Sequence, residues 1–203
     1  YASRGLGDVY KRQDPSRIGV LGDSAGGYLV QMLGATNGEK AFDKGDFMSV
    51  SSDVQAVCSF YGISDLTSIG EGLDEAQIRI HASPAVTEAL LVHGPAFGKF
   101  PGAGILSDRE KAMKASSLGH IDGSEPPFLV MHGSGDTLVS PMQSAHLYEA
   151  LKNAGVDVEY VLLEGAGHGD LPWFQKPVIN RVVTFFEQKL GSPARDAAEG
   201  NNL

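Results

Sequence analysis

The amino-acid sequence predicts a three-layer α/β/α sandwich built on a mostly parallel sheet. Short apolar segments suited to strands alternate with longer segments of helical character, which is the order that produces parallel strands with crossover helices. The strand segments are almost wholly apolar, as expected when helices cover both faces of a sheet. Glycine supplies 26 of the 203 residues, which indicates many tight turns between elements.

Composition excludes several classes of protein. Hydrophobic residues make up 42% and charged residues 20%, which is ordinary for a globular domain and excludes collagen, coiled coils and wholesale disorder. No apolar run approaches the length of about 18 residues that a membrane span requires. The single cysteine excludes a disulfide framework, and a net charge of −9 argues against nucleic-acid binding. No histidine pair has a metal-binding spacing, so no metal is expected.

The two ends of the chain are expected to lie outside the fold. Residues 8–13, D-V-Y-K-R-Q, resemble a translated sequencing adapter, so residues 1–13 are interpreted as foreign. The alternative is a native N-terminal arm. The domain is expected to cover residues 14–190, and residues 191–203, which are rich in Gly, Ala and Asn, to form a frayed tail.

Strand and helix signals alternate along residues 14–190. Solid apolar runs predict four strands at Arg17–Leu21, Val54–Tyr61, Pro127–Met131 and Val156–Glu164. Helices are predicted over Tyr28–Leu33, from Ser140 to about Asn153, and over Pro177–Leu190.

Local signals mark the start of the second helix and a long irregular segment. Ser140 is expected to be an N-cap, with Gln143 completing a capping box. Residues 66–123 are Gly-rich and are interpreted as a lid-like insertion over one end of the sheet, with a short helix after Pro84. The remaining histidines are interpreted as surface or lid residues: His81, His93, His120 and His146.

Residues Gly22–Gly26 match the pattern G-x-S-x-G, directly after a predicted strand and before a helix. That context predicts a nucleophile elbow, a strained turn that exposes the Ser24 hydroxyl and requires small neighbours. The backbone N–H of Ala25, at the start of the helix, is then placed to donate to a developing oxyanion.

A serine nucleophile needs a base and an orienting carboxylate. Asp136 follows the third predicted strand and His168 follows the fourth. Because the carboxyl ends of parallel strands meet at one edge of a sheet, all three groups are expected to converge. Asp65, after the second strand, is an alternative acid, whereas His132 is expected to brace the acid loop.

Other residues near these motifs have structural interpretations. Asp23 adjoins the serine and Asp170 follows the histidine too closely to orient it. Cys58 lies within a strand and is expected to be buried. Trp173 and Phe174 either line a substrate pocket or pack the last helix, and both alternatives stay open.

Four motifs stand out along the chain: G-D-S-A-G-G, F-Y-G-x-x-D (Phe60–Asp65), P-P-F-L-V-M-H-G-x-x-D (Pro126–Asp136) and G-A-G-H-G (Gly165–Gly169). Together they resemble the α/β-hydrolases of the esterase/lipase branch, namely the acetyl-esterase and hormone-sensitive-lipase-like group. The resemblance extends over residues 14–190, and the downstream half is most similar to the feruloyl and acetyl xylan esterases.

The resemblance implies hydrolysis of short-chain acyl or aryl esters, including esters on plant polysaccharides, through an acyl-enzyme and without a cofactor. Ser24 is then the nucleophile, His168 the base and Asp136 its partner. A peptidase or acyltransferase of the same fold, or an inactive fragment, is the alternative. The family's H-G-G-G-type loop and N-terminal strands do not precede Asp14, so the chain is expected to be a C-terminal half. Loss of one oxyanion donor typically costs about 100- to 1,000-fold in rate.

Overall fold

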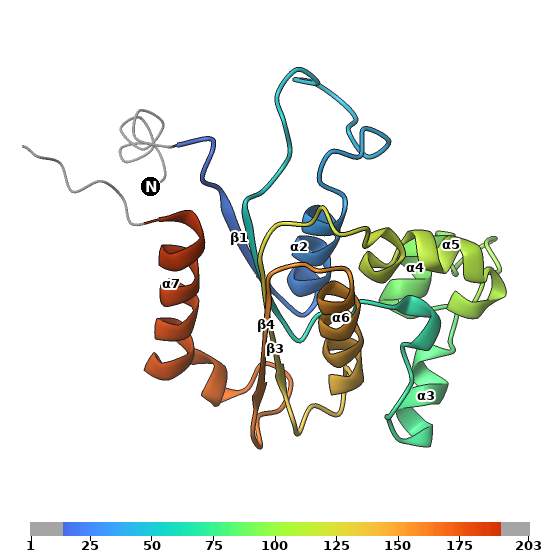
Figure 1. The fold of residues 1–203 in the computed structure, drawn as a ribbon. Helices are drawn as coiled ribbons and strands as arrows, with labels where there is room; N and C mark the ends of the chain where they lie inside the picture. Colours follow the sequence, from blue (N-terminus) through green and yellow to red (C-terminus); the bar gives the residue numbers. More distant parts are fainter. Residues whose placement is uncertain (1–13, 192–203) are drawn as a thin grey trace, which may run out of the picture.

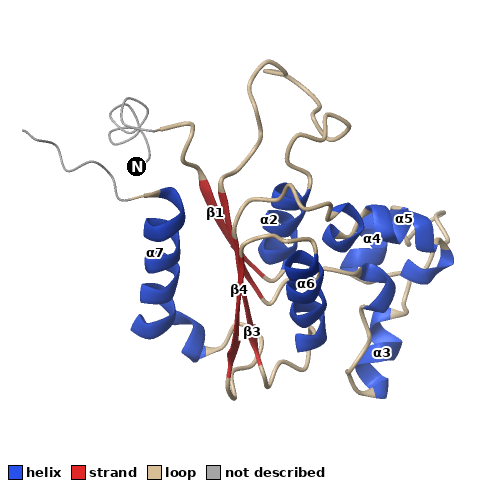
Figure 2. Cartoon of the chain, in the orientation of Figure 1, coloured by secondary structure: helices blue, strands red, loops and turns tan. Residues whose placement is uncertain are grey.

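The computed structural model describes residues 14–191, which fold around a four-stranded sheet in the order β1-β2-β3-β4. All neighbouring strands are parallel, as predicted, and Figure 2 shows them side by side between helices. The predictions for residues 1–13 and 192–203 lie outside the described residues. The strands are β1 (Gly19–Asp23), β2 (Ala56–Phe60), β3 (Phe128–Gly133) and β4 (Val158–Leu163).

Helices cover both faces of the sheet and complete the predicted three layers (Figure 1). Helix α7 (Lys176–Leu190) lies on one face, and α2 (Ala25–Ala35) and α6 (Pro141–Asn153) lie on the other. Alternate residues of a strand point to opposite faces. In β2, the buried Cys58 therefore joins the apolar cluster that contains α7 residues, while Val57 joins the cluster that contains α6 residues.

Three strands begin two residues later than predicted, and before β1 and β4 the intervening residues are held in turns. The Arg17 N–H donates to the Asp14 carbonyl (3.1 Å), and its guanidinium pairs with the Asp14 carboxylate (2.7 Å). Before β4, Gly155 has a φ of 83°, and the Val156 N–H donates back to the Leu151 carbonyl (2.9 Å). In both places the residues predicted as the start of the strand complete a turn, and the extended backbone begins after them.

The capping box predicted for α6 is wrong. Ser140 does cap the helix, since its Oγ accepts from the Met142 N–H at 3.3 Å. The Gln143 Oε1 instead accepts from the backbone N–H groups of Ser64 (2.9 Å) and Asp65 (2.8 Å). Gln143 thus ties α6 to the loop after β2, where the buried N–H of Ser64 would otherwise lack a partner.

The segment between β2 and β3 forms a set of short helices beside α2 and α6, on the side away from α7 (Figure 1). A small apolar core of its own holds it together, and α4 is the short helix predicted after Pro84. The division of the chain at residues 66 and 123 stays a prediction. Its elements are η1 (Leu66–Ser68), α3 (Glu75–His81), α4 (Thr87–His93), η2 (Ile105–Ser107), α5 (Arg109–Lys114) and η3 (Ser117–His120).

A last short helix, η4 (Leu171–Phe174), leads from β4 into α7. Between residues 14 and 191, no helix combines the length and the apolar character that crossing a membrane requires.

Candidate active site

Ser24 occupies the strained strand-to-helix turn that the G-x-S-x-G motif predicts. It lies between β1 and α2 with φ 52° and ψ −117°, a conformation that residues other than glycine rarely adopt. A Cβ on Gly22 would lie 2.1 Å from the Gly26 carbonyl oxygen, and one on Gly27 would lie 2.6 Å from the Phe60 oxygen. Gly26 itself has room, since the nearest atom to its Cβ would be 4.0 Å away.

The structure brings the three predicted side chains together. The Ser24 Oγ lies 2.8 Å from His168 Nε2, and His168 Nδ1 lies 2.8 Å from Asp136 Oδ2. The three residues follow β1, β4 and β3, so they meet at the carboxyl edge of the sheet. Because an ionised carboxylate only accepts hydrogen bonds, Nδ1 carries the proton and Nε2 is free to accept from the serine hydroxyl.

Asp136 is buried, with 5% of its surface exposed. Its Oδ1 accepts from the backbone N–H groups of Leu138 and Val139, both at 2.9 Å. Burial alone would raise the pKa of Asp136, but hydrogen bonds from His132, from His168 and from these two N–H groups hold it well below its usual value. The carboxyl group is therefore ionised and can only accept hydrogen bonds from the groups around it.

His132 braces the acid loop, as predicted. Its Nε2 lies 3.0 Å from the Val139 carbonyl and 3.2 Å from Asp136 Oδ2. Both partners are acceptors, so Nε2 must carry a proton, while the Ser144 hydroxyl, 2.7 Å from Nδ1, can donate. The ring is fully buried, so these contacts fix its orientation.

Residues that follow it in the sequence hold the loop that carries His168. Asp170 accepts from the Gly167 N–H at 2.7 Å, and the Trp173 Nε1–H donates to the Gly167 carbonyl at 2.8 Å. Trp173 is 2% exposed and joins the core beneath α7, whereas Phe174 is 66% exposed. For Trp173 the structure therefore favours the packing alternative.

Tyr61 contributes a contact that sequence reasoning missed. Its ring meets the His168 ring edge-on, with 4.6 Å between centroids, and its hydroxyl donates to Asp23 Oδ2 at 3.3 Å. Burial, followed by the charge of Asp23, raises the pKa of Tyr61 to about 12, so the phenol stays neutral. The only sequence signal was its place in the F-Y-G motif directly after β2.

Two interpretations from the sequence need correction. The Asp65 carboxylate caps η1 by accepting from the Thr67 N–H (2.7 Å) and is not the acid that contacts His168. For His81, interpreted as a surface or lid residue, the surface alternative is wrong, because only 7% of it is exposed. Its ring contacts the Glu88 carboxylate and the Leu138 carbonyl, partners that no local pattern in α3 indicates.

A cavity of about 280 Å³ opens beside the elbow. Ala25 is the first residue of α2, so its backbone N–H has no partner within the helix and can donate to an oxygen bound next to Ser24. Among residues 14–191, no three His, Cys, Asp or Glu side chains gather as a metal site would require. The cavity is lined by Ala25, Tyr28, Leu29, Ile63, Leu66, Thr87, Glu88 and Leu91.

Known proteins are similar to this chain in sequence and in fold. A Mycobacterium tuberculosis protein described as probable carboxylic ester hydrolase LipM is 28% identical over 139 residues, which is 68% of this chain and 28% of that protein. Esterase LipQ of the same organism is 30% identical over 156 residues, which is 76% of this chain and 33% of that protein. The chain thus spans a third or less of these relatives.

A solved structure described as a truncated form of a carbohydrate esterase from gut microbiota superposes with a TM-score of 0.73 at 26% identity, covering 91% of this chain and 63% of that one. The profile of the BD-FAE family matches residues 8–151, which is more than half of the chain. The chain therefore belongs to the BD-FAE family and has the α/β-hydrolase fold.

Proposed function

We propose that this chain carries the acyl-transfer centre of a serine carboxylesterase. The observation that carries the proposal is the pair of 2.8 Å contacts that link Ser24, His168 and Asp136. Ser24 Oγ attacks the ester carbonyl while His168 Nε2 takes its proton, and the oxyanion that forms accepts from the Ala25 N–H. His168 then returns the proton to the departing alcohol.

The second half of the reaction uses the same groups. A water molecule attacks the acyl-serine carbonyl, His168 accepts a proton from the water, and the released Ser24 hydroxyl regains it as the acid departs. Asp136 stabilises the charged form of His168 in both halves. The second oxyanion donor, on an H-G-G-G-type loop, would lie outside residues 14–191 and stays a prediction.

The size of the cavity beside Ala25 favours a substrate with a small group there. At about 280 Å³ and lined mainly by aliphatic and aromatic side chains, it suits a short acyl or aryl group rather than a long chain. The likeness to a carbohydrate esterase supports esters carried on sugars, including those of plant polysaccharides, as the substrate class.

Hydrolysis of p-nitrophenyl acetate tests the proposal, with Ser24→Ala as the decisive variant. Two forms are assayed: the chain as it stands, and the chain extended at its N-terminus by the residues that its gene encodes upstream. Removal of the nucleophile is expected to lower kcat about 10⁶-fold, which leaves only the rate enhancement from the oxyanion hole and from substrate binding. Equal rates for the unaltered protein and its Ser24→Ala variant would overturn the serine mechanism. A preference for aminoacyl anilides over esters would indicate a peptidase.

A further inference from the structure

His81 lies between two acceptors, one on the insertion and one in the acid loop. Its Nδ1 lies 2.5 Å from Glu88 Oε1, and its Nε2 lies 3.1 Å from the Leu138 carbonyl oxygen. A carboxylate and a carbonyl both only accept, so each ring nitrogen must carry a proton. The geometry therefore requires an imidazolium, and the hydrogen bond to Glu88 correspondingly raises the pKa of His81.

The contact with Leu138 leads directly to the catalytic acid. The Leu138 carbonyl and the Val139 N–H belong to one peptide group, and that N–H donates to Asp136 Oδ1 at 2.9 Å. A charged donor on the carbonyl end polarises the peptide and strengthens the hydrogen bond from its N–H end. His81 and Asp136 thus bind opposite ends of one peptide group.

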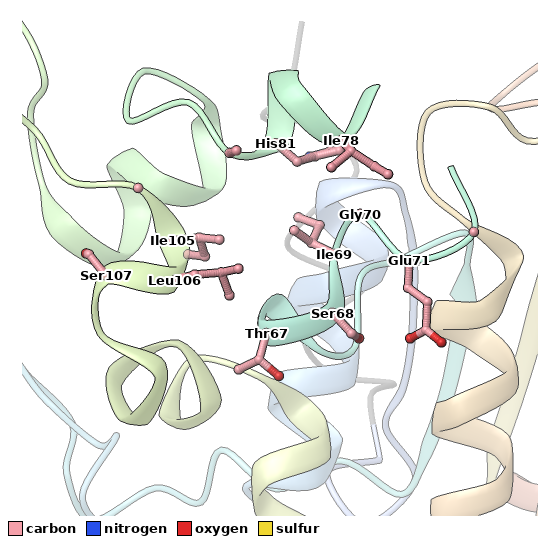
Figure 3. Close-up of a pocket in the computed structure, with 13 residues that line it drawn as sticks. Thr67, Ser68, Ile69, Gly70, Glu71, Ile78, His81, Ile105, Leu106 and Ser107 are labelled. Atoms are coloured by element: carbon pink, nitrogen blue, oxygen red, sulfur yellow. The ribbon is translucent and has the colours of Figure 1, made fainter. Parts of the chain in front are cut away.

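The ring of His81 is buried and has a hydrogen-bond partner at each nitrogen. On one side His81 borders a cavity of about 590 Å³, whose lining also includes Ile69, Ile78 and Ile105 (Figure 3). Other charges near this cavity have their own partners: Glu71 lies 4.0 Å from His146 on α6, and Arg79 pairs with Glu75 within α3. Glu88 is therefore the charged group that holds His81.

We propose that His81 is a positioning residue, which fixes the Leu138–Val139 peptide so that Asp136 stays aimed at His168. The inference rests on the proposed function, since it assigns the acid loop a catalytic role. Glu88 also lines the cavity beside Ala25, so the His81–Glu88 pair joins the proposed substrate cavity to the acid loop.

A double variant, His81→Phe with Glu88→Leu, tests the proposal without leaving a buried unpaired carboxylate. Loss of alignment is expected to lower kcat for p-nitrophenyl acetate about 10- to 100-fold. KM is reported separately, because Glu88 also lines the cavity beside Ala25. The proton NMR signal of His168 Nδ1–H should weaken as its hydrogen bond to Asp136 loosens. His81→Gln combined with the same Glu88→Leu change restores an N–H donor for Leu138 and should recover most of the lost kcat.

The matched control is His93→Phe, because His93 lies in the same insertion and contacts the Ile105 carbonyl instead (3.4 Å); its kcat should not change. An unchanged kcat in the double variant, or no recovery when residue 81 is Gln in the same Glu88→Leu background, overturns the positioning role. If the unaltered chain hydrolyses no ester, the proposed function fails, and the His168 proton signal then decides alone. A signal unchanged by the double variant overturns the role of His81, and its loss supports it.

Discussion

The turn that carries Ser24 and the loop that carries Asp136 are built in different ways. Backbone sterics shape the first, through a positive φ at Ser24 and a close approach of Gly22 to the Gly26 carbonyl. Hydrogen bonds shape the second, since two backbone N–H groups and two histidines converge on the Asp136 carboxylate. The serine turn should therefore respond to added volume, and the acid loop to changes in charge and in hydrogen-bond donors.

Among the changes that test this comparison, Asp136→Asn should produce the largest effect, because it keeps the volume of the side chain and removes its charge. The Asn amide would present N–H donors where two backbone N–H groups and two histidines already donate. His168 then loses the acceptor that fixes its Nδ1–H tautomer. In the serine-protease triad the same change costs about 10⁴-fold in kcat, and a loss of that order is expected here in p-nitrophenyl acetate hydrolysis.

Asp23→Asn is the matched control for Asp136→Asn. Asp23 is also a carboxylate at this edge of the sheet, but it accepts from Tyr61 and not from His168. An amide oxygen can accept the same hydrogen bond, so its kcat should fall far less. A loss of similar size in both variants would show that the site responds to total charge rather than to the orientation of His168.

Gly22→Ala tests the other half of the comparison by adding volume without charge. Its Cβ would lie 2.1 Å from backbone oxygen, so the turn must shift, and the free energy of unfolding should fall by about 1–3 kcal/mol. Gly26→Ala is the control, because its Cβ meets nothing closer than 4.0 Å and alanine favours a helix. Urea unfolding measures both, and equal losses would contradict a steric origin.

The same difference explains what could be predicted from the sequence. The serine turn is encoded by consecutive residues, and the positions of Asp136 and His168 follow from the strand before each. Alternation of apolar strands with helices predicted the parallel sheet and its three layers. Each of these inferences uses local sequence and one rule about where strand ends meet.

Two long-range contacts around the site could not be predicted in this way. His81 reaches the Leu138 carbonyl across 57 positions, and Gln143 reaches the Ser64 N–H across 79. Both contacts start from short helices or helix ends whose direction depends on the packing of an irregular insertion. A lone histidine in α3 looks like a surface residue, because neither its burial nor its partners leave a periodic signal.

The pH dependence of stability should give the smallest effect and should separate the two regions. The hydrogen bond to Glu88 raises the pKa of His81 above its usual 6.5, so folding favours the protonated ring. The resulting stabilisation is complete below about pH 6.5, where the unfolded chain is protonated too, and is lost as the pH rises through the folded-state pKa. Glu88 and Asp136, both with lowered pKa values, stay ionised throughout this range.

Urea unfolding at a series of pH values from about 6 upward measures this contribution. The difference in unfolding free energy between the unaltered chain and the His81→Phe, Glu88→Leu double variant should shrink as the pH rises. For Gly22→Ala the corresponding difference should stay constant with pH, because a steric clash neither binds nor releases a proton. A constant difference for the double variant would mean that His81 is held as a neutral ring, and the charge-based account of the acid loop would then be wrong.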